Sequence, residues 1–226
     1  MQRQMTEIIH NAGVHGSVKS PLLHLDRGEM TEVLKIYDDK VRPDPASSIV
    51  LEMIDASALL WRLKLEGVDL EHRFVQLAAT WERAAEDAFY TFNDLHAMMA
   101  FLGAGRVSDA EHVLKAMRRA AADSGDNGYA TRKIGLPLAE AFLAFEAGRY
   151  RECVEKIVAV RGIAQRFGGS HAQRDVLTLT ALHVALKGGI GGAAEALTAE
   201  RLAHKPHSPW AGRLAQRTRA LNETSV

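Results

Sequence analysis

Apolar residues recur along this chain at the spacing of helical faces, not in the strict alternation of a half-buried strand. Residues three, four and seven positions apart lie on one side of an α-helix. The stretches from Pro45 to Pro137 and from Pro137 to Pro206 contain no internal proline that would break a helix. We therefore predict an all-α fold. Three of the stripes are Phe92, Leu95, Met99 and Leu102; Val107, Ala110, Val113, Leu114, Met117 and Ala121; and Tyr150, Cys153, Val154, Ile157, Val160, Ala164 and Phe167.

Glycines recur between the apolar stripes at a spacing of about 40 residues, which is typical of helical repeats. Glycine is favoured just after a helix because it adopts the left-handed backbone conformation at low cost. A helix, a tight turn and a second helix fill such a spacing. The glycines are Gly28, Gly67, Gly105, Gly148 and Gly189. We predict five helical hairpins, at about 16–41, 48–86, 88–122, 135–167 and 173–204, and a terminal helix at about 208–222.

A single amphipathic hairpin cannot bury its own apolar face, so neighbouring hairpins have to stack on one another. We therefore expect a superhelix of hairpins over residues 16–226, preceded by an irregular segment over residues 1–15. The first helices of successive hairpins would line its concave surface. A non-repetitive helical bundle is the alternative that the same apolar pattern allows.

Composition and charge exclude several classes of protein. The 28 Lys and Arg residues balance the 28 Asp and Glu residues, so the excess of basic charge typical of nucleic-acid binders is absent. No apolar run approaches the length of about 20 residues that spans a bilayer, and the N-terminus lacks the pattern of an export signal. The single cysteine, Cys153, rules out an internal disulfide framework. We expect a cytoplasmic protein without a membrane or nucleic-acid partner.

Five longer strings stand out in the chain: IDASALLWRLKLEGVDLEHR (54–73), FNDLHAMMAFLGAG (92–105), GLPLAEAFLAFEAGRY (135–150), GGSHAQRDV (168–176) and KPHSPW (205–210). Together they resemble the C-terminal half of the tetratricopeptide repeat protein 38 family. The resemblance implies a tetratricopeptide-like α-α superhelix and a cytoplasmic setting, and it implies no established chemistry. One departure lies at the N-terminal edge, where His10 and Asn11 are followed by His15 without the tryptophan of the family pattern.

The sequence GGSHAQRD, residues 168–175, is the strongest polar cluster. Ser170 and Gln173 have the spacing of a capping box, in which each side chain binds a free backbone N–H of the other residue. Capping leaves His171, Arg174 and Asp175 unexplained. His171 and Asp175 are four residues apart, so the carboxylate is placed to orient the imidazole. The cluster is either a helix cap with packing contacts or a ligand-binding site.

Two further groups of polar residues interrupt helical stripes. Asn93 is a candidate helix cap, and Asp94 and His96 follow it on a helix that would face the concave surface. Asp55 interrupts an apolar helix, where a carboxylate has to be paired, hydrogen-bonded or protonated. Arg62, two turns further on, and Arg132 are its candidate partners. Each group is either structural or part of a site.

The scattered histidines do not indicate a metal site. His10, His15 and His24 lie near one another in sequence, but none of them is four residues from another. We expect no metal and no other cofactor.

The first functional hypothesis is a non-enzymatic module that binds a peptide, a protein partner or a small ligand in a concave groove. The alternative is a small-molecule-binding protein or enzyme with an Asp/His/Arg pocket on the same face. An incomplete repeat array also exposes an apolar end, so we expect the chain to self-associate into a homo-oligomer. The candidate ligand-binding residues are Asp55, Asn93, Asp94, His96, Arg132, His171, Gln173, Arg174 and Asp175.

Overall fold

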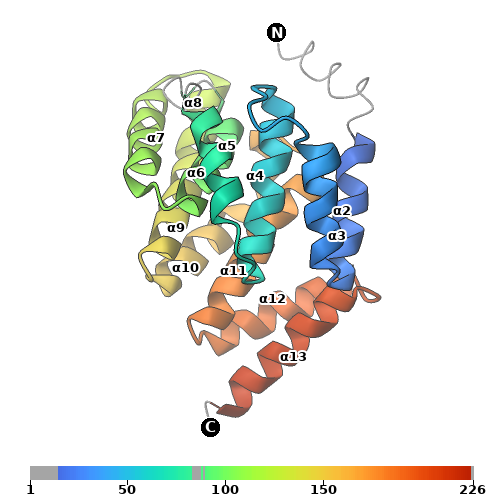
Figure 1. The fold of residues 1–226 in the computed structure, drawn as a ribbon. Helices are drawn as coiled ribbons and strands as arrows, with labels where there is room; N and C mark the ends of the chain where they lie inside the picture. The colour runs from blue at the N-terminus through green and yellow to red at the C-terminus, as the bar shows by residue number, and fades with distance from the viewer. Residues whose placement is uncertain (1–14, 83–87, 89, 225–226) are drawn as a thin grey trace.

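The described residues form helices and turns, with no strand among them, in a computed structural model that describes residues 15–82, 88 and 90–224 (Figure 1). The prediction of an all-α fold is therefore confirmed. Helices that are adjacent in sequence pack as pairs. The pairs are α2 (His15–Arg27) with α3 (Met30–Ile36), α4 (Val50–Leu65) with α5 (Glu71–Trp81), α6 (Thr91–Gly103) with α7 (Val107–Ala120), α9 (Leu136–Glu146) with α10 (Tyr150–Arg161), and α11 (His171–Lys187) with α12 (Gly191–His204).

The remaining elements extend these pairs. A π-helical turn, η1 (Tyr37–Val41), continues α3, and a 3-10 turn, η3 (Ala164–Phe167), follows α10. The fourth hairpin begins earlier than predicted, because α8 (Asp126–Ala130) and the π-helical η2 (Thr131–Gly135) run directly into α9. The terminal helix α13 (Pro209–Thr224) lies close to its predicted range. Of the expected irregular N-terminal segment, residues 1–14 lie outside the described residues, and His15 begins α2.

The five turns inside the pairs share one geometry. The central glycine of each has a positive φ between 66° and 84°. The N–H of the following residue donates a hydrogen bond to a carbonyl of the last helical turn, at 2.8 to 3.1 Å. This is the Schellman pattern of helix termination, which requires the left-handed conformation at the glycine. The bonds are Glu29 to His24, Val68 to Leu63, Arg106 to Phe101, Arg149 to Ala144 and Ile190 to Ala185.

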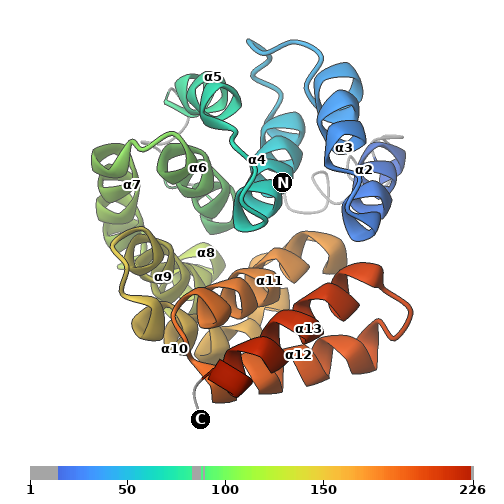
Figure 2. The same ribbon diagram turned by 60° about the horizontal axis from the view of Figure 1, so that its bottom comes forward.

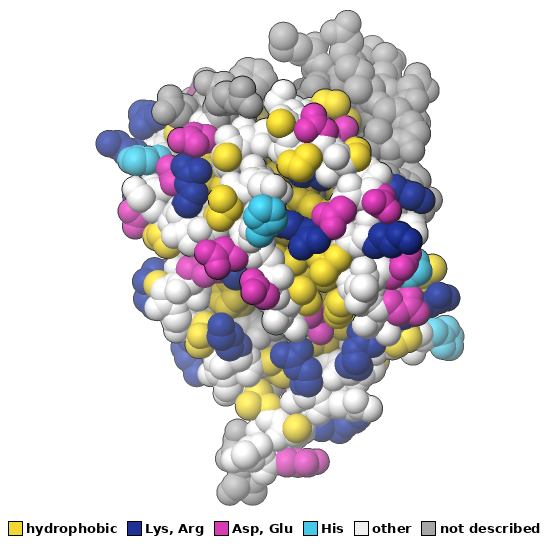
Figure 3. Space-filling model, in the orientation of Figure 1, with side chains coloured by type: hydrophobic (Ala, Val, Ile, Leu, Met, Phe, Trp, Pro, Cys, Tyr) yellow, Lys and Arg dark blue, Asp and Glu magenta, His cyan; other side chains and the backbone are white. Residues whose placement is uncertain are grey.

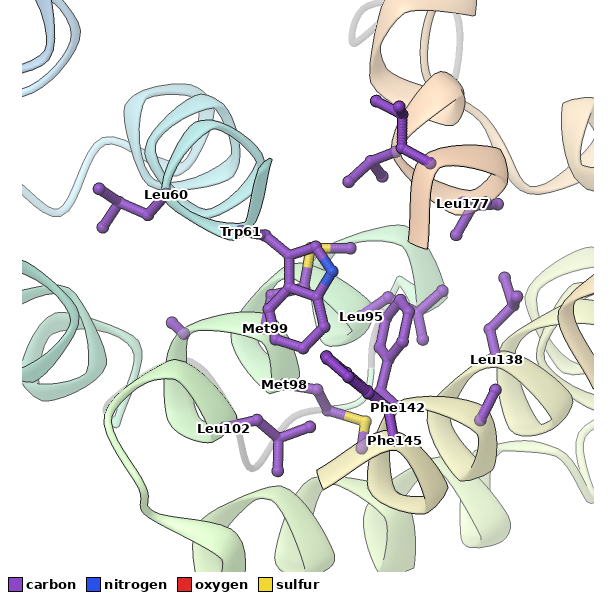
Figure 4. Close-up of a cluster of buried hydrophobic side chains, with 14 of the residues drawn as sticks. Leu60, Trp61, Leu95, Met98, Met99, Leu102, Leu138, Phe142, Phe145 and Leu177 are labelled. Carbon is purple, nitrogen blue, oxygen red and sulfur yellow. The ribbon is translucent and has the colours of Figure 1, made fainter. Parts of the chain in front are cut away.

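The first helices of four successive pairs pack directly on one another. Helix α4 contacts α6 and α11, and α6 contacts α9. Trp61 of α4 lies at the centre of this layer, fully buried, with its ring centroid 5.3 Å from Phe142 and 5.9 Å from Phe145 (Figure 4). Its indole N–H donates to Thr180 Oγ1 on α11 at 3.0 Å. The inner faces of these helices therefore bury one another instead of lining an open groove.

The chain curves round until its last helix returns to its first described one (Figure 2). Helix α13 packs against α2 as well as α12. The Ser208 hydroxyl donates to the Asp26 carboxylate, and Arg213 donates to the carbonyl of Leu25 at 3.4 Å. Both ends of the described array are thus held against each other, and this closure decides which surfaces remain available to a ligand.

Candidate functional site

Arg62 is the centre of a buried polar cluster between α4, α6 and α11. Its guanidinium donates to the carbonyl of Ala58 at 2.8 Å and to the carbonyl of Ala172 at 2.5 Å, at the start of α11. Burial lowers the pKa of Arg62 to about 10, and the nearby carboxylates Asp175 and Asp55 partly offset this. The group stays protonated near neutral pH, so the cluster holds a buried positive charge.

Asp175 supplies most of the compensating negative charge. Its carboxylate lies 3.1 Å from Nη1 of Arg201, in the last turn of α12, and 3.0 Å from Nζ of Lys205, which directly follows that helix. Burial alone would raise the pKa of Asp175, but Arg201, Lys205 and Arg62 together hold it below its usual value. The expected contact between Asp175 and His171 is replaced by these two ion pairs, and the imidazole of His171 is exposed.

The start of α11 has the cap that its sequence predicts. Ser170 Oγ accepts from the backbone N–H of Gln173, and Gln173 Oε1 accepts from the N–H of Ser170, which completes the capping box. The amide of Gln173 also approaches Asp55 Oδ1 at 3.4 Å. Arg174 donates to the carbonyls of Gly168 and Gly169. These side chains therefore fix the loop before α11 and tie it to α4.

Helix α6 begins earlier than Asn93, so the predicted cap at Asn93 is wrong. The helix starts at Thr91, whose backbone N–H donates at 3.1 Å to Asn127 Oδ1 from a later segment. Asp94 and His96 are both buried on this helix. His96 Nδ1 donates to the carbonyl of Phe92 at 2.7 Å. Burial lowers the pKa of His96 to about 4, which leaves the imidazole neutral at pH 7.

Arg132 does not join the cluster. Its guanidinium donates to the carbonyls of Ala121 and Asp123, so it closes the turn before α8 instead of pairing with Asp55. Of the two candidate partners of Asp55, Arg62 is the one that lies close enough to interact electrostatically. The structure thus brings Asp55, His96, Gln173 and Asp175 around Arg62.

A pocket of about 520 Å³ lies elsewhere, at the ends of α4, α9 and α11 where they meet α13. This volume is within the range of about 300–1,000 Å³ that is common for small-ligand sites. Its apolar wall includes Leu65, Phe145 and Leu186. None of the nine residues proposed from the sequence lines it. The full lining is Lys64, Leu65, Gly67, Phe145, His183, Leu186, Lys187, Arg217, Ala220, Leu221 and Thr224.

The ionisable side chains in this lining are all basic. Lys64 Nζ is paired with Glu146 at 2.6 Å and also donates to the carbonyl of Leu102. Lys187 Nζ lies over two aromatic rings, 5.4 Å from the centroid of Phe145 and 5.6 Å from that of Tyr150. On the face shown in Figure 3, several Lys and Arg side chains lie on the lower part of the molecule, which α12 and α13 form (Figure 1).

His183 is the fourth basic group and the most buried of them, with 3% of its side chain exposed. Its Nε2 lies 3.2 Å from Glu66 Oε1, and this oxygen accepts a hydrogen bond from Trp210 Nε1 at 2.6 Å. Burial lowers the pKa of His183, and Glu66 offsets this only in part. Burial would raise the pKa of Glu66, but His183, Trp210 and Arg217 hold it below its usual value. A neutral imidazole therefore faces a charged carboxylate beside the pocket.

This pocket could not be predicted from the sequence, because its walls come from four separate helices. A partial signal is present in the chain, since Lys64 and Lys187 occupy the last turns of α4 and α11. Cations are common there because they interact favourably with the carbonyl end of a helix. That general preference hides the fact that both residues border one pocket. Arg217, on α13, has no such signal.

Across the described ranges, none of the helices combines the length and apolar character of a membrane span. Within the same residues, no group of three or more His, Cys, Asp or Glu side chains is placed to hold a metal ion. The chain matches no protein-family model. No solved structure matches it.

Proposed function

We propose that this chain is a non-enzymatic binding module built of tetratricopeptide-like hairpins, and that its ligand occupies the pocket between α4, α9, α11 and α13. The observation that carries the proposal is the composition of the pocket wall, where an apolar floor that includes Phe145 adjoins the basic side chains of Lys187 and Arg217. Binding sites commonly combine a mostly apolar lining with a few polar groups that orient the ligand.

The proposed site replaces the concave groove that the hairpin pattern predicts. That groove would run along the inner faces of α4, α6, α9 and α11, where Trp61, Phe142 and Phe145 are packed together. A ligand cannot enter this layer without displacing buried rings, which costs several kcal/mol. The pocket lies at the end of the same layer, where Phe145 forms part of its wall, and it is open to solvent.

The resemblance to the tetratricopeptide repeat protein 38 family is part of this proposal. It is supported by the position of the similar strings, which fall on α4, on α6, on η2 and α9, on the start of α11 and on the segment before α13. Helices paired around glycine turns are compatible with such repeats. A cytoplasmic setting belongs to the same proposal and rests on the single cysteine.

An enzyme is the second candidate, because His183 and Glu66 form a histidine–carboxylate pair beside the pocket, 3.2 Å apart. A neutral imidazole oriented by a carboxylate is a common general base. Here, however, the second ring nitrogen, Nδ1, is covered by protein atoms. The pair also joins α4 to α11, and Trp210 attaches α13 to the same carboxylate. We therefore favour a structural role for this pair, with binding as the activity.

The test blocks the pocket without touching the core. Ala220 is an exposed pocket residue on α13, so Ala220→Trp places a large ring in the pocket mouth. Ala159→Trp, on an exposed position of α10 outside the pocket, is the matched control. Native mass spectrometry after incubation with libraries of small metabolites and short peptides should show ligands retained by the wild type and the control but lost in Ala220→Trp. Equal retention by all three proteins would contradict the proposed site.

Self-association stays a separate prediction. The contact between α13 and α2 covers part of the array ends that we expected to be exposed. Size-exclusion chromatography with light scattering measures the outcome directly. A monomer at high protein concentration would contradict this prediction and would leave the pocket unaffected.

A further inference from the structure

We infer that the pocket binds a carboxylate attached to an apolar body, such as a free aryl or alkyl carboxylic acid or the C-terminal residue of a peptide. This inference rests on the proposed function and names its ligand class. Two properties of the described lining carry it: the balance of charges around the pocket, and the apolar surface beneath those charges.

Three side chains of the lining carry a permanent positive charge: Lys64, Lys187 and Arg217. Lys64 is neutralised by Glu146, with which it forms an ion pair of 2.6 Å. Arg217 has only a loose partner, because its Nη1 lies 3.9 Å from Glu66 Oε1 and 48% of its side chain is exposed. Its guanidinium is therefore available for a second acceptor.

Lys187 is the cation with the least compensation. Its ammonium group lies over the rings of Phe145 and Tyr150, and no carboxylate in the described part of the chain is within ion-pair distance of it. A cation–π contact attracts the ammonium without neutralising its charge. The aromatic rings thus hold a positive charge at the pocket edge in a defined position, ready to bind an anion.

These contributions leave about one positive charge for a ligand. Lys64 and Glu146 cancel, and Glu66 opposes Arg217 while His183 is neutral, because burial lowers its pKa. A carboxylate carries one negative charge and accepts charge-assisted hydrogen bonds from an ammonium and a guanidinium. A phosphate dianion would keep an uncompensated charge beside Glu66. The charge balance therefore favours the monoanion.

The apolar part of the lining indicates which kind of group the carboxylate of the ligand is attached to. Leu65, Phe145, Leu186 and Ala220 surround a volume far larger than a carboxylate group needs. Apolar surface removed from water contributes roughly 25 cal/mol per Å² to binding. An acid with an aromatic ring or a short alkyl chain would cover this wall while its carboxylate reaches Lys187 and Arg217.

A matched pair of probes tests the charge requirement. We expect 4-phenylbutyrate to bind at least about tenfold more tightly than 4-phenylbutanamide, which has nearly the same shape but no charge. Isothermal titration calorimetry at low and high salt measures both, and the preference for the acid should shrink as salt rises. Equal affinities for the acid and the amide would overturn the inferred ligand class and leave the pocket as a binding site.

Two variants that remove a charge test whether Lys187 and Arg217 cause the preference for the acid over the amide. Lys187→Gln and Arg217→Gln should each weaken acid binding about fivefold or more and leave amide binding unchanged. Lys115→Gln and Arg119→Gln, which remove exposed cations from α7 away from the pocket, should change neither affinity. Thermal unfolding of each variant checks that the fold is retained. A loss of acid preference in the α7 controls would show a non-specific charge effect and contradict the assignment.

The source of the carboxylate is tested with peptides. A tetrapeptide ending in phenylalanine is compared with its C-terminal amide and with 4-phenylbutyrate. Tight binding of the peptide acid alone assigns the pocket to a peptide C-terminus, and tight binding of the free acid alone assigns it to a small molecule. If Ala220→Trp still binds the acid as the wild type does, the proposed pocket itself fails, whereas a lost acid–amide difference affects only the ligand class.

Discussion

The indole Nε1 of Trp61 on α4 donates a hydrogen bond to Thr180 Oγ1 on α11, 3.0 Å away, although 119 positions separate the two residues. The contact joins the second described hairpin to the fifth across the centre of the molecule. Thr180 in turn donates to the carbonyl of Val176 on its own helix. This buried pairing, together with the rings around Trp61, closes the inner layer and leaves the pocket at its end.

Removal of the central ring should destabilise the fold strongly. Trp61→Ala takes away a fully buried indole and leaves a cavity beside Phe142, so we expect a loss of about 3–5 kcal/mol in the free energy of unfolding. Val75→Ala, at a position with 48% exposure, should cost less than about 0.5 kcal/mol. Urea unfolding followed by circular dichroism measures both. Similar costs for the two variants would contradict the central role of Trp61.

Two glycine-to-alanine substitutions should change the free energy of unfolding in opposite directions, because only one of the two glycines has a positive φ. Gly148 has a φ of 73° and free space around it, so Gly148→Ala should cost about 1–2 kcal/mol through backbone strain alone. Gly212, inside α13, also has free space but no positive φ. Gly212→Ala should therefore stabilise the protein by up to about 1 kcal/mol. Thermal unfolding of both variants compares the signs, and destabilisation by both would argue against the turn geometry.

The buried ion pairs of Asp175 should matter more than a comparable surface pair. Asp175→Asn leaves the buried Arg201 without its charged partner, so we expect a cost of about 2–3 kcal/mol at pH 7, allowing for the partial exposure of Asp175. Asp38→Asn removes the exposed partner of Arg73 and should cost less than about 1 kcal/mol. Chemical denaturation gives both values, and an equal small cost would mean that solvent screens the Asp175 pairs.

The lowered pKa of Asp175 also predicts that the free energy of unfolding decreases at acid pH. Because the pKa of Asp175 is held below its unfolded value of 3.8, its contribution is present above that pH and is lost as the pH falls through the lower folded pKa. Between pH 5 and pH 3 the wild type should therefore lose more stability than Asp175→Asn. A parallel loss in both proteins would contradict a lowered pKa.

His96 should make the protein sensitive to pH in a higher range. Its pKa is 6.5 in the unfolded chain and about 4 in the fold, so the unfolded state binds a proton first as the pH falls. Its contribution is complete above pH 6.5 and is progressively lost towards pH 4. From pH 7 to pH 4.5 the wild type should lose about 2–3 kcal/mol more than His96→Leu, measured by urea unfolding at each pH. An identical pH dependence of both proteins would show that the pKa of His96 is the same in the folded and unfolded chain, which would contradict a pKa lowered by burial.

The hairpin arrangement was predictable because its determinants are local. A glycine such as Gly105 after an apolar stripe specifies both the end of one helix and the start of the next, within a few residues. The capping box of Ser170 and Gln173 is local in the same way, and the structure confirms it. Such features need only the neighbouring residues, which the sequence supplies directly.

The candidate site was not predictable in this way, because it is formed by contacts between distant segments of the chain. The periodicity of apolar residues does not reveal such contacts. The N–H of Thr91 is capped by Asn127, so the expected role of Asn93 was wrong. Arg62 reaches the carbonyl of Ala172 on another hairpin, a bond that uses no side chain of the partner and leaves no sequence signal. The pocket likewise exists because α13 returns across the ends of α4 and α11, a direction that its amphipathic pattern does not define.

The most direct test of the account is an NMR titration of the isotope-labelled protein with 4-phenylbutyrate, which maps the amides that the ligand perturbs. We predict that the shifted amides cluster at Lys64–Gly67, Phe145, His183–Lys187 and Arg217–Leu221, and that they return to their free positions in Ala220→Trp. Shifts centred on Arg62, His96 and Asp175 would contradict the central claim that the pocket bordered by Phe145 is the binding site. The absence of any saturable shift would contradict the inferred carboxylate ligand.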